Sequence, residues 1–401
     1  MQEKKLNIVF LSTYPPRECG LATFTQDLME AIDAVGTVNS YVIAVNNSIS
    51  REYGDKVIHE INQYNQLDYT DLARKLNNSD MDLLVIEHEF GIYGGEYGEY
   101  IMGLLKNVNI PVITTLHTVL KRPNPKQKKI IRELGERSTK LVTMAQNTKE
   151  ILEKVYKISP DKIEVIHHGV PIWDELDRQS LKNEMGYGKK ILISTFGLLS
   201  PGKGIEYAIS AIAKTVEETS NILYLILGKT HPDQKDESYR EMLEGLVTKY
   251  NIENNVKFIN KYLTKEEIIR YLQMSDIYMT PYLSREQAVS GTLAYAVGYG
   301  RAIVSTPYLY AKEMLADKRG MLAEFENADS LYKCLDFIIK NPDEKADMEK
   351  RTLTLGKTMF WPIVAQCYID LFTREDQLNQ EASLIVFPQL MVNIENGVVE
   401  C

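Results

Sequence analysis

Two rounds of one pattern, a short apolar run followed by an amphipathic segment, occupy most of the chain. In the first round the apolar runs predict strands, and the segments with apolar residues at helical spacing predict helices. The predicted strands are residues 6–12, 41–45, 82–87, 112–117, 140–145 and 162–166, and the predicted helices are 22–34, 69–76, 97–106, 126–134 and 148–155. This alternation favours a parallel sheet covered by helices on both faces.

The second round begins after a polar, charged stretch at residues 171–188, which is the predicted linker. Its predicted strands are residues 190–196, 223–228, 256–260, 277–281, 302–306 and 321–325, and its helices are 205–216, 238–249, 264–273, 293–299, 310–315 and 328–340. We therefore expect an α/β fold with two Rossmann-like domains, residues 1–170 and 189–357. An interdomain cleft at the carboxyl ends of the strands is the expected ligand site.

The pattern changes again near the end of the chain. Residues 345–359 and 360–372 predict two more helices, with Pro362 tolerated in the first turn of the second. We expect residues 358–373 to form a helix that returns to the first domain. Residues 374–401 lose the periodicity and form the predicted tail. Its apolar stretch at 382–399, interrupted by Pro388, fits either a docked strand or a loosely ordered end.

Composition narrows the class of protein. The 401 residues carry a net charge of −9 and are 44% hydrophobic, which is typical of a soluble globular protein and argues against a nucleic-acid partner. The four cysteines are scattered, so neither a disulfide framework nor a zinc site is expected, and a cytoplasmic location fits best. Without a signal peptide or a run of about 18 apolar residues, at most a peripheral membrane contact is expected.

A candidate phosphate site lies near the start of the predicted helix at residues 293–299. Ser290, Gly291 and Thr292 precede that helix, and the amides at a helix start, with the positive end of its dipole, suit a phosphate. A capped helix without a ligand explains the same residues. A second loop, residues 197–204, follows a strand and contains Lys203 between two glycines. It lacks the P-loop spacing, and it fits either a phosphate contact or a tight turn with a solvated lysine.

Other candidates lie at the strand ends of the first domain. His117 ends a strand at the carboxyl edge, and Glu87, His88 and Glu89 end another. A metal site there is not expected, because no third ligand of clear spacing appears. Asp80 and Asp82 resemble a metal-binding D-x-D but lie at the wrong end of their strand.

For two further groups of residues, a structural role is favoured over a binding role. His167 and His168 point in opposite directions on a strand, so a turn or hinge role is favoured over a shared metal. A solvated surface is favoured over a membrane or anionic-acceptor patch for the basic cluster Lys121, Arg122, Lys126, Lys128, Lys129 and Arg132.

Taken in order, these loops resemble those of the family 4 retaining glycosyltransferases, which have the GT-B fold of two facing Rossmann-like domains. The resemblance covers nearly the whole chain, from Gly20 to Trp361. Residues 197–204 resemble the family's "G-R-L-x-x-x-K-G" loop, residues 166–170 its "I-P-N-G-V" segment, residues 275–281 its "A-D-v-f-v-x-P" segment, and residues 286–306 its E-x7-E box with the turn after it.

The resemblance implies transfer of a hexose, with mannose or glucose favoured, from a nucleotide-diphosphate sugar to a carbohydrate or lipid-linked acceptor, without a metal or another cofactor. The anomeric configuration would be retained by front-face displacement, the leaving phosphate drawing the acceptor proton. The implied catalytic residues are His117, Glu286 and Lys203; those that bind the donor or its phosphates are Gly197, Lys203, Gly228, Gln287, Ser290, Gly291 and Thr292; and those on the acceptor side are Arg17, Gly20 and Glu89.

The chain departs from the family's pattern at three positions. Leu198 stands where the family has an arginine, and Tyr295 stands at the second glutamate of the box. An ungapped count places Gln287 at the first glutamate, whereas Glu286 fits with a shift of one residue. These departures leave open a phosphorylase that uses a sugar 1-phosphate, and a non-catalytic sugar-binding protein. The sequence predicts no oligomeric state.

Overall fold

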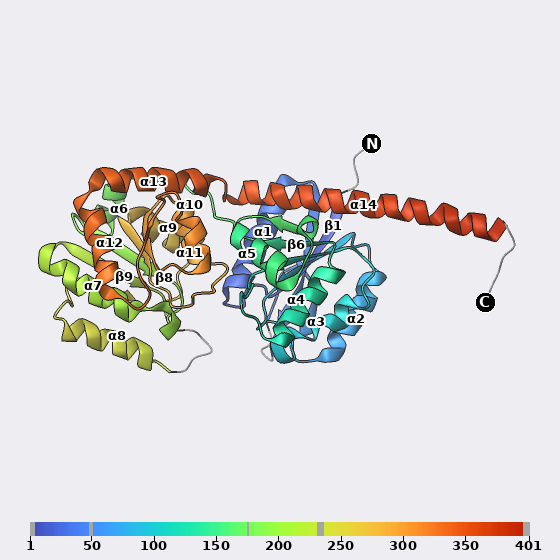
Figure 1. Ribbon diagram of the computed structural model, residues 1–401, viewed down its shortest axis with the longest axis horizontal. Coiled ribbons are helices and arrows are strands. Elements are labelled where there is room, and N and C mark those ends of the chain that lie inside the picture. Colours follow the sequence, from blue (N-terminus) through green and yellow to red (C-terminus); the bar gives the residue numbers. More distant parts are fainter. Residues whose placement is uncertain (1–4, 48–50, 175, 231–235, 396–401) are drawn as a thin grey trace. The chain divides into compact units, whose positions relative to one another are not determined.

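The protein consists of two compact units, each built around one parallel sheet (Figure 1). The computed structural model describes residues 5–47, 51–174, 176–230 and 236–395, the stretch 382–395 by its backbone alone. Unit 1 comprises Met1–Met144, Thr148–Ile166 and Trp361–Cys401, and unit 2 comprises Ala145–Asn147 and His167–Phe360. The predicted α/β fold with two Rossmann-like units is confirmed.

In unit 1 the strand order is β3-β2-β1-β4-β5-β6-β7, and every neighbouring pair is parallel. The strands are β1 (Leu6–Ser12), β2 (Val38–Asn46), β3 (Val57–Asn62), β4 (Leu83–His88), β5 (Val112–Leu116), β6 (Lys140–Thr143) and β7 (Ile163–Val165). The sequence did not predict β3. It is an edge strand with alternating partly buried and exposed residues and one fully buried side chain, Ile61, so it lacks the apolar run of a central strand.

The α-helices of unit 1 cover this sheet. They are α1 (Gly20–Val35), α2 (Gln66–Asn77), α3 (Ile101–Leu105), α4 (Pro125–Arg137), α5 (Gln146–Ile151) and α14 (Trp361–Glu395). Short 3-10 turns lie at Glu96–Gly98 and Pro160–Lys162, and a π-helical turn, Leu152–Tyr156, continues α5. Helix α4 begins with a capping box in which Asn124 and Gln127 bind each other's backbone.

Helix α14 corrects the predicted end of the chain. It packs along α1 (Figure 1), and Phe372, Trp361 and Tyr368 join the core of unit 1. The helix continues to Glu395, whereas the sequence predicted a tail from residue 374 onward. Residues 377–381 are exposed, so no apolar face marks them, and their glutamine, leucine and glutamate residues are good helix formers. Residues 396–401 of the predicted tail lie outside the described residues.

In unit 2 the strand order is β10-β9-β8-β11-β12-β13, again parallel throughout. The strands are β8 (Ile191–Phe196), β9 (Ile222–Leu227), β10 (Val256–Ile259), β11 (Ile277–Thr280), β12 (Ala302–Ser305) and β13 (Met321–Leu322). Its helices are α6 (Arg178–Glu184), α7 (Ile205–Glu218), α8 (Ser238–Lys249), α9 (Lys265–Met274), α10 (Gly291–Gly298), α11 (Leu309–Met314), α12 (Ala328–Lys340) and α13 (Pro342–Lys357), with a 3-10 turn at Pro201–Lys203.

Helix α6 corrects the predicted linker at residues 171–188. Asp177 caps the helix, which packs on α9 and buries Leu181. Lys182 is also buried, and its ammonium is paired with Asp276 beside β11. Because this helix is short and buries a single apolar side chain, its charged sequence shows no helical spacing of apolar residues. The region therefore belongs to unit 2.

Candidate functional site

The order of the strands marks one edge of each sheet as a binding edge. Ligands of doubly wound sheets bind outside the carboxyl ends of the strands, at the point where the strand order reverses. In unit 2 the order reverses between β8 and β11, and in unit 1 between β1 and β4. The loops that follow these strands therefore define a candidate site in each unit, and most of the predicted residues lie in or beside them.

Lys203 in unit 2 lies against an aromatic ring. It ends the 3-10 turn after β8, and its ammonium is 4.0 Å from the ring centroid of Tyr282, which follows β11. The amide of Leu283 donates to the carbonyl of Gly202 over 3.0 Å, which joins the same two loops. The residue after the lysine, Gly204, has a φ of 62° and leads into α7. The cation therefore lies at the reversal point, and the glycine permits the turn that holds it there.

Helix α10 begins at Gly291 and is linked to this lysine through Tyr282. Its cap is Ser290, whose hydroxyl accepts from the amide of Leu293 over 3.3 Å. The hydroxyl of Thr292 is 2.8 Å from that of Tyr282 and 3.2 Å from that of Ser290. The first amides of a helix have no partner within the helix, and its dipole is positive at this end. Lys203 and the start of α10 thus form an electropositive group, which we call the cation seat: Lys203, Tyr282, Ser290, Gly291 and Thr292.

Gly197 and Gly228 are both predicted to bind the donor. The backbone itself gives a reason for glycine at each of these positions. They directly follow β8 and β9, and both have positive φ values, 133° and 142°. A Cβ on Gly228 would lie 2.0 Å from the carbonyl oxygen of Gly197, which no side chain can accommodate. A Cβ on Gly197 would lie 3.5 Å from Cγ2 of Thr292, so this glycine also borders the cation seat.

Glu286 and Gln287 lie in the turn that precedes α10. The backbone of this turn is anchored, because the amides of Leu309 and Tyr310 donate to the carbonyls of Arg285 and Gln287. The side-chain amide of Gln287 donates to the carbonyl of Val289 over 3.1 Å. Both candidates for the first box position are therefore adjacent in one turn, and Gln287 helps to hold that turn in shape.

His168 contacts the start of α10, which sequence analysis did not predict. Its Nδ1 donates to the carbonyl of Gly169 over 2.7 Å, consistent with the turn role predicted for the histidine pair. Its Nε2 would lie 3.1 Å from a Cβ on Gly291, so the ring lies directly against the first residue of the helix. Tyr295, one turn along α10, is 9% exposed and lies edge-on to the rings of His168 and Phe196. The adjacency is visible only in the fold, because the sequence separates the two segments by more than a hundred residues.

In unit 1 the structure places His117 against a buried carboxylate. Its Nε2 is 2.7 Å from Oε2 of Glu87, at the end of the neighbouring strand β4. Glu87 is fully buried, and its other oxygen has no hydrogen-bond partner among the described residues. The ring of Phe24, from α1, meets the imidazole edge-on with centroids 4.8 Å apart. The imidazole is thus held in one orientation at the carboxyl edge of the sheet.

His88, next along β4, is a buried residue of a different kind. Its ring stacks on Tyr93 and meets Phe90 edge-on, and within the described part of the chain neither ring nitrogen has a hydrogen-bond partner. Burial, with a smaller effect from His117, lowers the pKa of His88 to about 3. His88 is therefore a neutral core residue. The partly exposed imidazole at this edge of the sheet is that of His117.

The residues predicted on the acceptor side lie at the same edge of unit 1. Arg17 follows β1 and donates to the carbonyl of Val45 at the end of β2 over 3.2 Å. Gly20 opens α1 and is exposed. Glu89 follows β4, where its carboxylate accepts from the hydroxyl of Thr118 and from the amide of Phe90. The fold brings these two loops, after β1 and after β4, to one edge.

Two sequence features prove to be structural. Asp82 accepts from the amide of Asn7 over 2.8 Å at the amino end of the sheet. Lys126, of the basic cluster, pairs with Glu96 and Glu99 at 2.7 and 2.9 Å. Among the described residues, no group of three or more histidine, cysteine, aspartate or glutamate side chains is placed to hold a metal. None of the helices in the described part is both long and apolar enough to cross a membrane.

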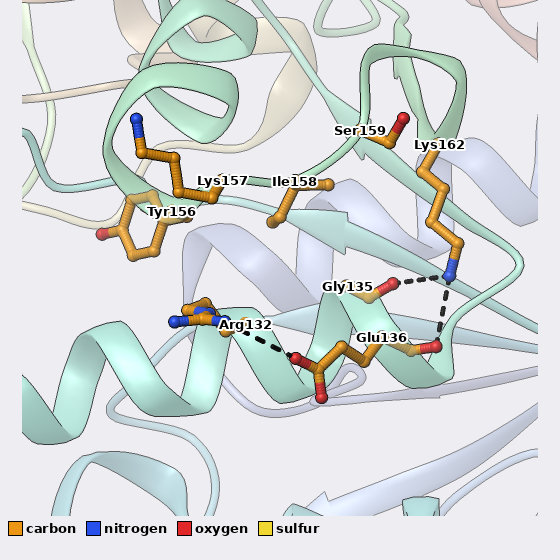
Figure 2. Close-up of a pocket in the computed structure, with 8 residues that line it drawn as sticks. All are labelled: Arg132, Gly135, Glu136, Tyr156, Lys157, Ile158, Ser159 and Lys162. Carbon is orange, nitrogen blue, oxygen red and sulfur yellow. Dashed lines mark hydrogen bonds and ion pairs between the residues drawn. The ribbon is translucent and has the colours of Figure 1, made fainter.

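A cavity of about 150 Å³ in unit 1 lies beside the π-helical turn and the end of α4 (Figure 2). Its lining includes Arg132, Lys157 and Lys162. The ammonium of Lys162 donates to the carbonyls of Gly135, Glu136 and Ser138, at the end of α4, over 2.8 to 3.2 Å. This lysine therefore caps a helix, and the cavity belongs to that packing.

Comparison with known proteins identifies both halves of the chain. Residues 177–354 match the model of "Glycosyl transferases group 1", and residues 20–173 match that of "Glycosyltransferase Family 4". An uncharacterised glycosyltransferase of Methanocaldococcus jannaschii is 23% identical over 168 residues, which are 40% of this chain and 41% of that protein.

Solved structures of low sequence identity share the fold. The Anabaena protein Alr3699/HepE, crystallised with UDP and glucose, superposes with a TM-score of 0.71 at 14% identity, over 92% of this chain and 100% of that one. The sucrose-phosphate synthase of Thermosynechococcus elongatus gives a TM-score of 0.73 at 15% identity, over 92% and 100% of the two chains.

Proposed function

The chain belongs to the family 4, or group 1, glycosyltransferases, and on that premise we propose that it transfers a hexose from a nucleoside-diphosphate sugar to a hydroxyl acceptor. The proposal is supported above all by the cation seat of unit 2. There the ammonium of Lys203 and the first amides of α10 lie together at the reversal point of a parallel sheet. Such a site suits a diphosphate.

The same group accounts for catalysis of the bond cleavage. Breaking the bond between the sugar's C1 and the phosphate oxygen leaves negative charge on the diphosphate, and fixed positive groups stabilise that charge as it develops. The new bond joins C1 to the acceptor oxygen, whose proton passes to the departing phosphate. Lys203 and the helix dipole then carry out the charge stabilisation that a metal ion performs in other transferases, and the anomeric configuration is retained.

For the donor we propose a uridine-diphosphate hexose, with glucose as the first sugar to test. The Anabaena protein of similar fold was crystallised with UDP and glucose, which motivates this choice. In unit 1 we propose that His117 lines the donor sugar, and that Arg17, Gly20 and Glu89 border the acceptor. The acceptor is a carbohydrate or a lipid-linked hydroxyl.

A phosphorylase is the second candidate, and Tyr295 is the observation that favours it. This residue stands where the family places the glutamate that holds the ribose. Its ring is enclosed by Phe196 and His168 instead of presenting a carboxylate. Leu198 likewise replaces a charged residue of the family's loop. Weaker contacts to a nucleotide would suit an enzyme that transfers the sugar of a sugar 1-phosphate to an acceptor hydroxyl and releases inorganic phosphate, or runs this reaction in reverse.

Ligand-induced stabilisation separates these candidates. UDP or GDP is expected to raise the melting temperature of a transferase, because a ligand that binds only the folded state stabilises it. Phosphate alone should do so for a phosphorylase.

Lys203→Ala should weaken UDP binding about 10- to 100-fold, as expected for a lost charge-assisted contact. The control Lys249→Ala removes a lysine that lies 5.8 Å from the ring of Tyr250. Equal UDP affinity in the two variants would remove the phosphate role of Lys203.

A further inference from the structure

One side chain in unit 2 contacts both halves of the cation seat. Tyr282 presents its ring face to the ammonium of Lys203 at 4.0 Å, and its hydroxyl is 2.8 Å from Oγ1 of Thr292. We propose that Tyr282 is a positioning residue, which holds Lys203 and the start of α10 in the arrangement that receives the diphosphate. The inference rests on the proposed function, because it assigns a role within the same site.

The contact with Lys203 is closer than the other lysine–tyrosine contacts in the described part of the chain. Those four place the ammonium between 5.3 and 6.0 Å from the ring centroid. A lysine ammonium within about 6 Å of an aromatic centroid is attracted by the negative face of the ring. The flexible four-carbon stem of a lysine otherwise leaves its charge free to move through many positions. The ring therefore localises the charge before an anion arrives.

The hydroxyl end of Tyr282 contacts the helix. Thr292 is the second residue of α10, and its own hydroxyl lies 3.2 Å from that of the cap, Ser290. Its methyl group lies beside Gly197 at the end of β8. The tyrosine hydroxyl thereby connects the loop after β11 to the first turn of the helix.

Tyr282 is rigid enough to position its neighbours. It is 1% exposed, and its ring stacks on Tyr308 with centroids 5.6 Å apart and an angle of 19° between the planes. Its carbonyl accepts from the hydroxyl of Thr306 over 2.5 Å. Lys203 is only partly buried by comparison. A fixed ring thus faces a flexible cation, so the ring determines where the cation lies.

Localising the lysine reduces the cost of ordering it on binding. Immobilising a flexible side chain costs about 0.5–1.5 kcal/mol on association, so removing the ring should weaken diphosphate binding by about 2- to 10-fold. This effect passes through Lys203. Loss of the hydroxyl acts through Thr292 and is independent of the lysine.

The test measures the affinity for UDP by titration calorimetry in two backgrounds, wild type and Lys203→Ala. Tyr282→Leu removes the ring and the hydroxyl, and Tyr282→Phe removes the hydroxyl alone. Matched controls are Tyr250→Leu and Tyr250→Phe, because Tyr250 also lies near a lysine, and its hydroxyl is 3.2 Å from that of Ser210. The controls should leave the affinity unchanged.

In the wild-type background we expect Tyr282→Leu to weaken UDP binding more than Tyr282→Phe does. In the Lys203→Ala background this difference should vanish, because the ring acts through the lysine. A difference of equal size in both backgrounds, or none in either, would overturn the positioning role while leaving the proposed function in place. Wild-type protein that binds neither UDP, GDP nor phosphate would refute the proposed function itself, and this inference with it.

A spectroscopic measurement covers the case in which Tyr282→Leu does not fold. After reductive methylation with an isotope-labelled reagent, the NMR signal of Lys203 should show a ring-current shift in wild type and in Tyr282→Phe. The signal is assigned by its loss in Lys203→Ala. An unshifted Lys203 signal in the wild-type protein would refute the contact on which the inference depends.

Discussion

At the scale of single residues, each unit holds one polar side chain at its binding edge against a buried partner. Unit 2 presents an ammonium over a tyrosine ring, whereas unit 1 presents an imidazole against a buried carboxylate. In both units the side chain at the edge, Lys203 or His117, is partly exposed. Its partner, Tyr282 or Glu87, is buried. An enclosed partner restricts the reactive group to one orientation, which favours catalysis by positioning.

The pairing of His117 with Glu87 gives a prediction that separates function from stability. His117→Ala should lower turnover by about 100-fold, a typical effect of losing one catalytic electrostatic contact. It also leaves the buried carboxylate of Glu87 without its partner, which should cost about 1–3 kcal/mol of unfolding free energy.

Adding Glu87→Gln to His117→Ala replaces that buried carboxyl group with an amide. We expect urea unfolding to show the stability largely restored, while initial-rate assays with the donor sugar show turnover still low. Recovery of turnover along with stability would make His117 a structural residue.

His88 gives a prediction on pH. Its pKa falls from the ordinary 6.5 to about 3 because the folded protein buries it, so between these values the unfolded chain binds a proton that the folded chain does not. Stability therefore falls as the pH drops from 6.5 toward 3, by about 1.4 kcal/mol per unit from this residue. In His88→Phe the fall of unfolding free energy with pH should be shallower, as followed by urea unfolding at several pH values. Parallel curves for the two proteins would contradict the assignment of His88 as a neutral core residue.

At the scale of elements, the ends of β8 and β9 determine the shape of the loop that carries Lys203. Each strand is followed directly by a glycine with positive φ, and the backbones of the two glycines approach too closely for a side chain on Gly228. The lysine loop starts from this contact, so its geometry depends on both strands. The early turns of α14 are held by core packing, whereas residues 377–381 are exposed and rest on helix propensity.

The glycine contact predicts opposite effects for two equivalent substitutions. Gly228→Ala should destabilise the protein by at least about 2 kcal/mol, because its Cβ would meet the carbonyl of Gly197 at a strained φ. Gly245→Ala, in the interior of α8 with open space around it, should stabilise by up to about 1 kcal/mol. Chemical denaturation of both variants checks this. A Gly228→Ala variant as stable as wild type would show that the strand ends can separate.

At the scale of the whole molecule, unit 1 is assembled from segments far apart in the chain. Its sheet forms from the first part of the sequence, whereas α14, from the end, supplies part of its core. Phe372 meets Phe10 of β1 with centroids 6.4 Å apart, and Tyr368 reaches Thr115 of β5. Unit 1 therefore cannot complete its core until nearly all of the chain is present.

This arrangement predicts where a substitution in α14 acts. Phe372→Ala should cost about 3–5 kcal/mol, as for a large buried aromatic. Hydrogen exchange should show the lost protection in the strands of unit 1, with unit 2 unchanged. Leu378→Ala, in the same helix but 58% exposed, is the control and should have little effect. Equal loss of protection in both units would contradict the division of the chain.

Local pattern was sufficient for much of the fold. Apolar runs and helical spacing are properties of short segments, and they predicted the central strands of both sheets, most of the helices and the start of α10 at Ser290. The patterns failed for β3, α6 and the later part of α14. In β3, in α6 and at residues 377–381 of α14, few side chains face a core, so burial does not impose a periodicity on the sequence.

The sequence by itself determined which residues have useful chemistry and at which strand ends they lie, because strand ends follow from local pattern. Only the tertiary structure decided which of them meet. Tyr282 beneath Lys203, His168 against Gly291, and Glu87 behind His117 join segments brought together by parallel strand pairing and helix packing. Such contacts depend on strand order and register, which long-range packing selects and no short stretch of sequence specifies.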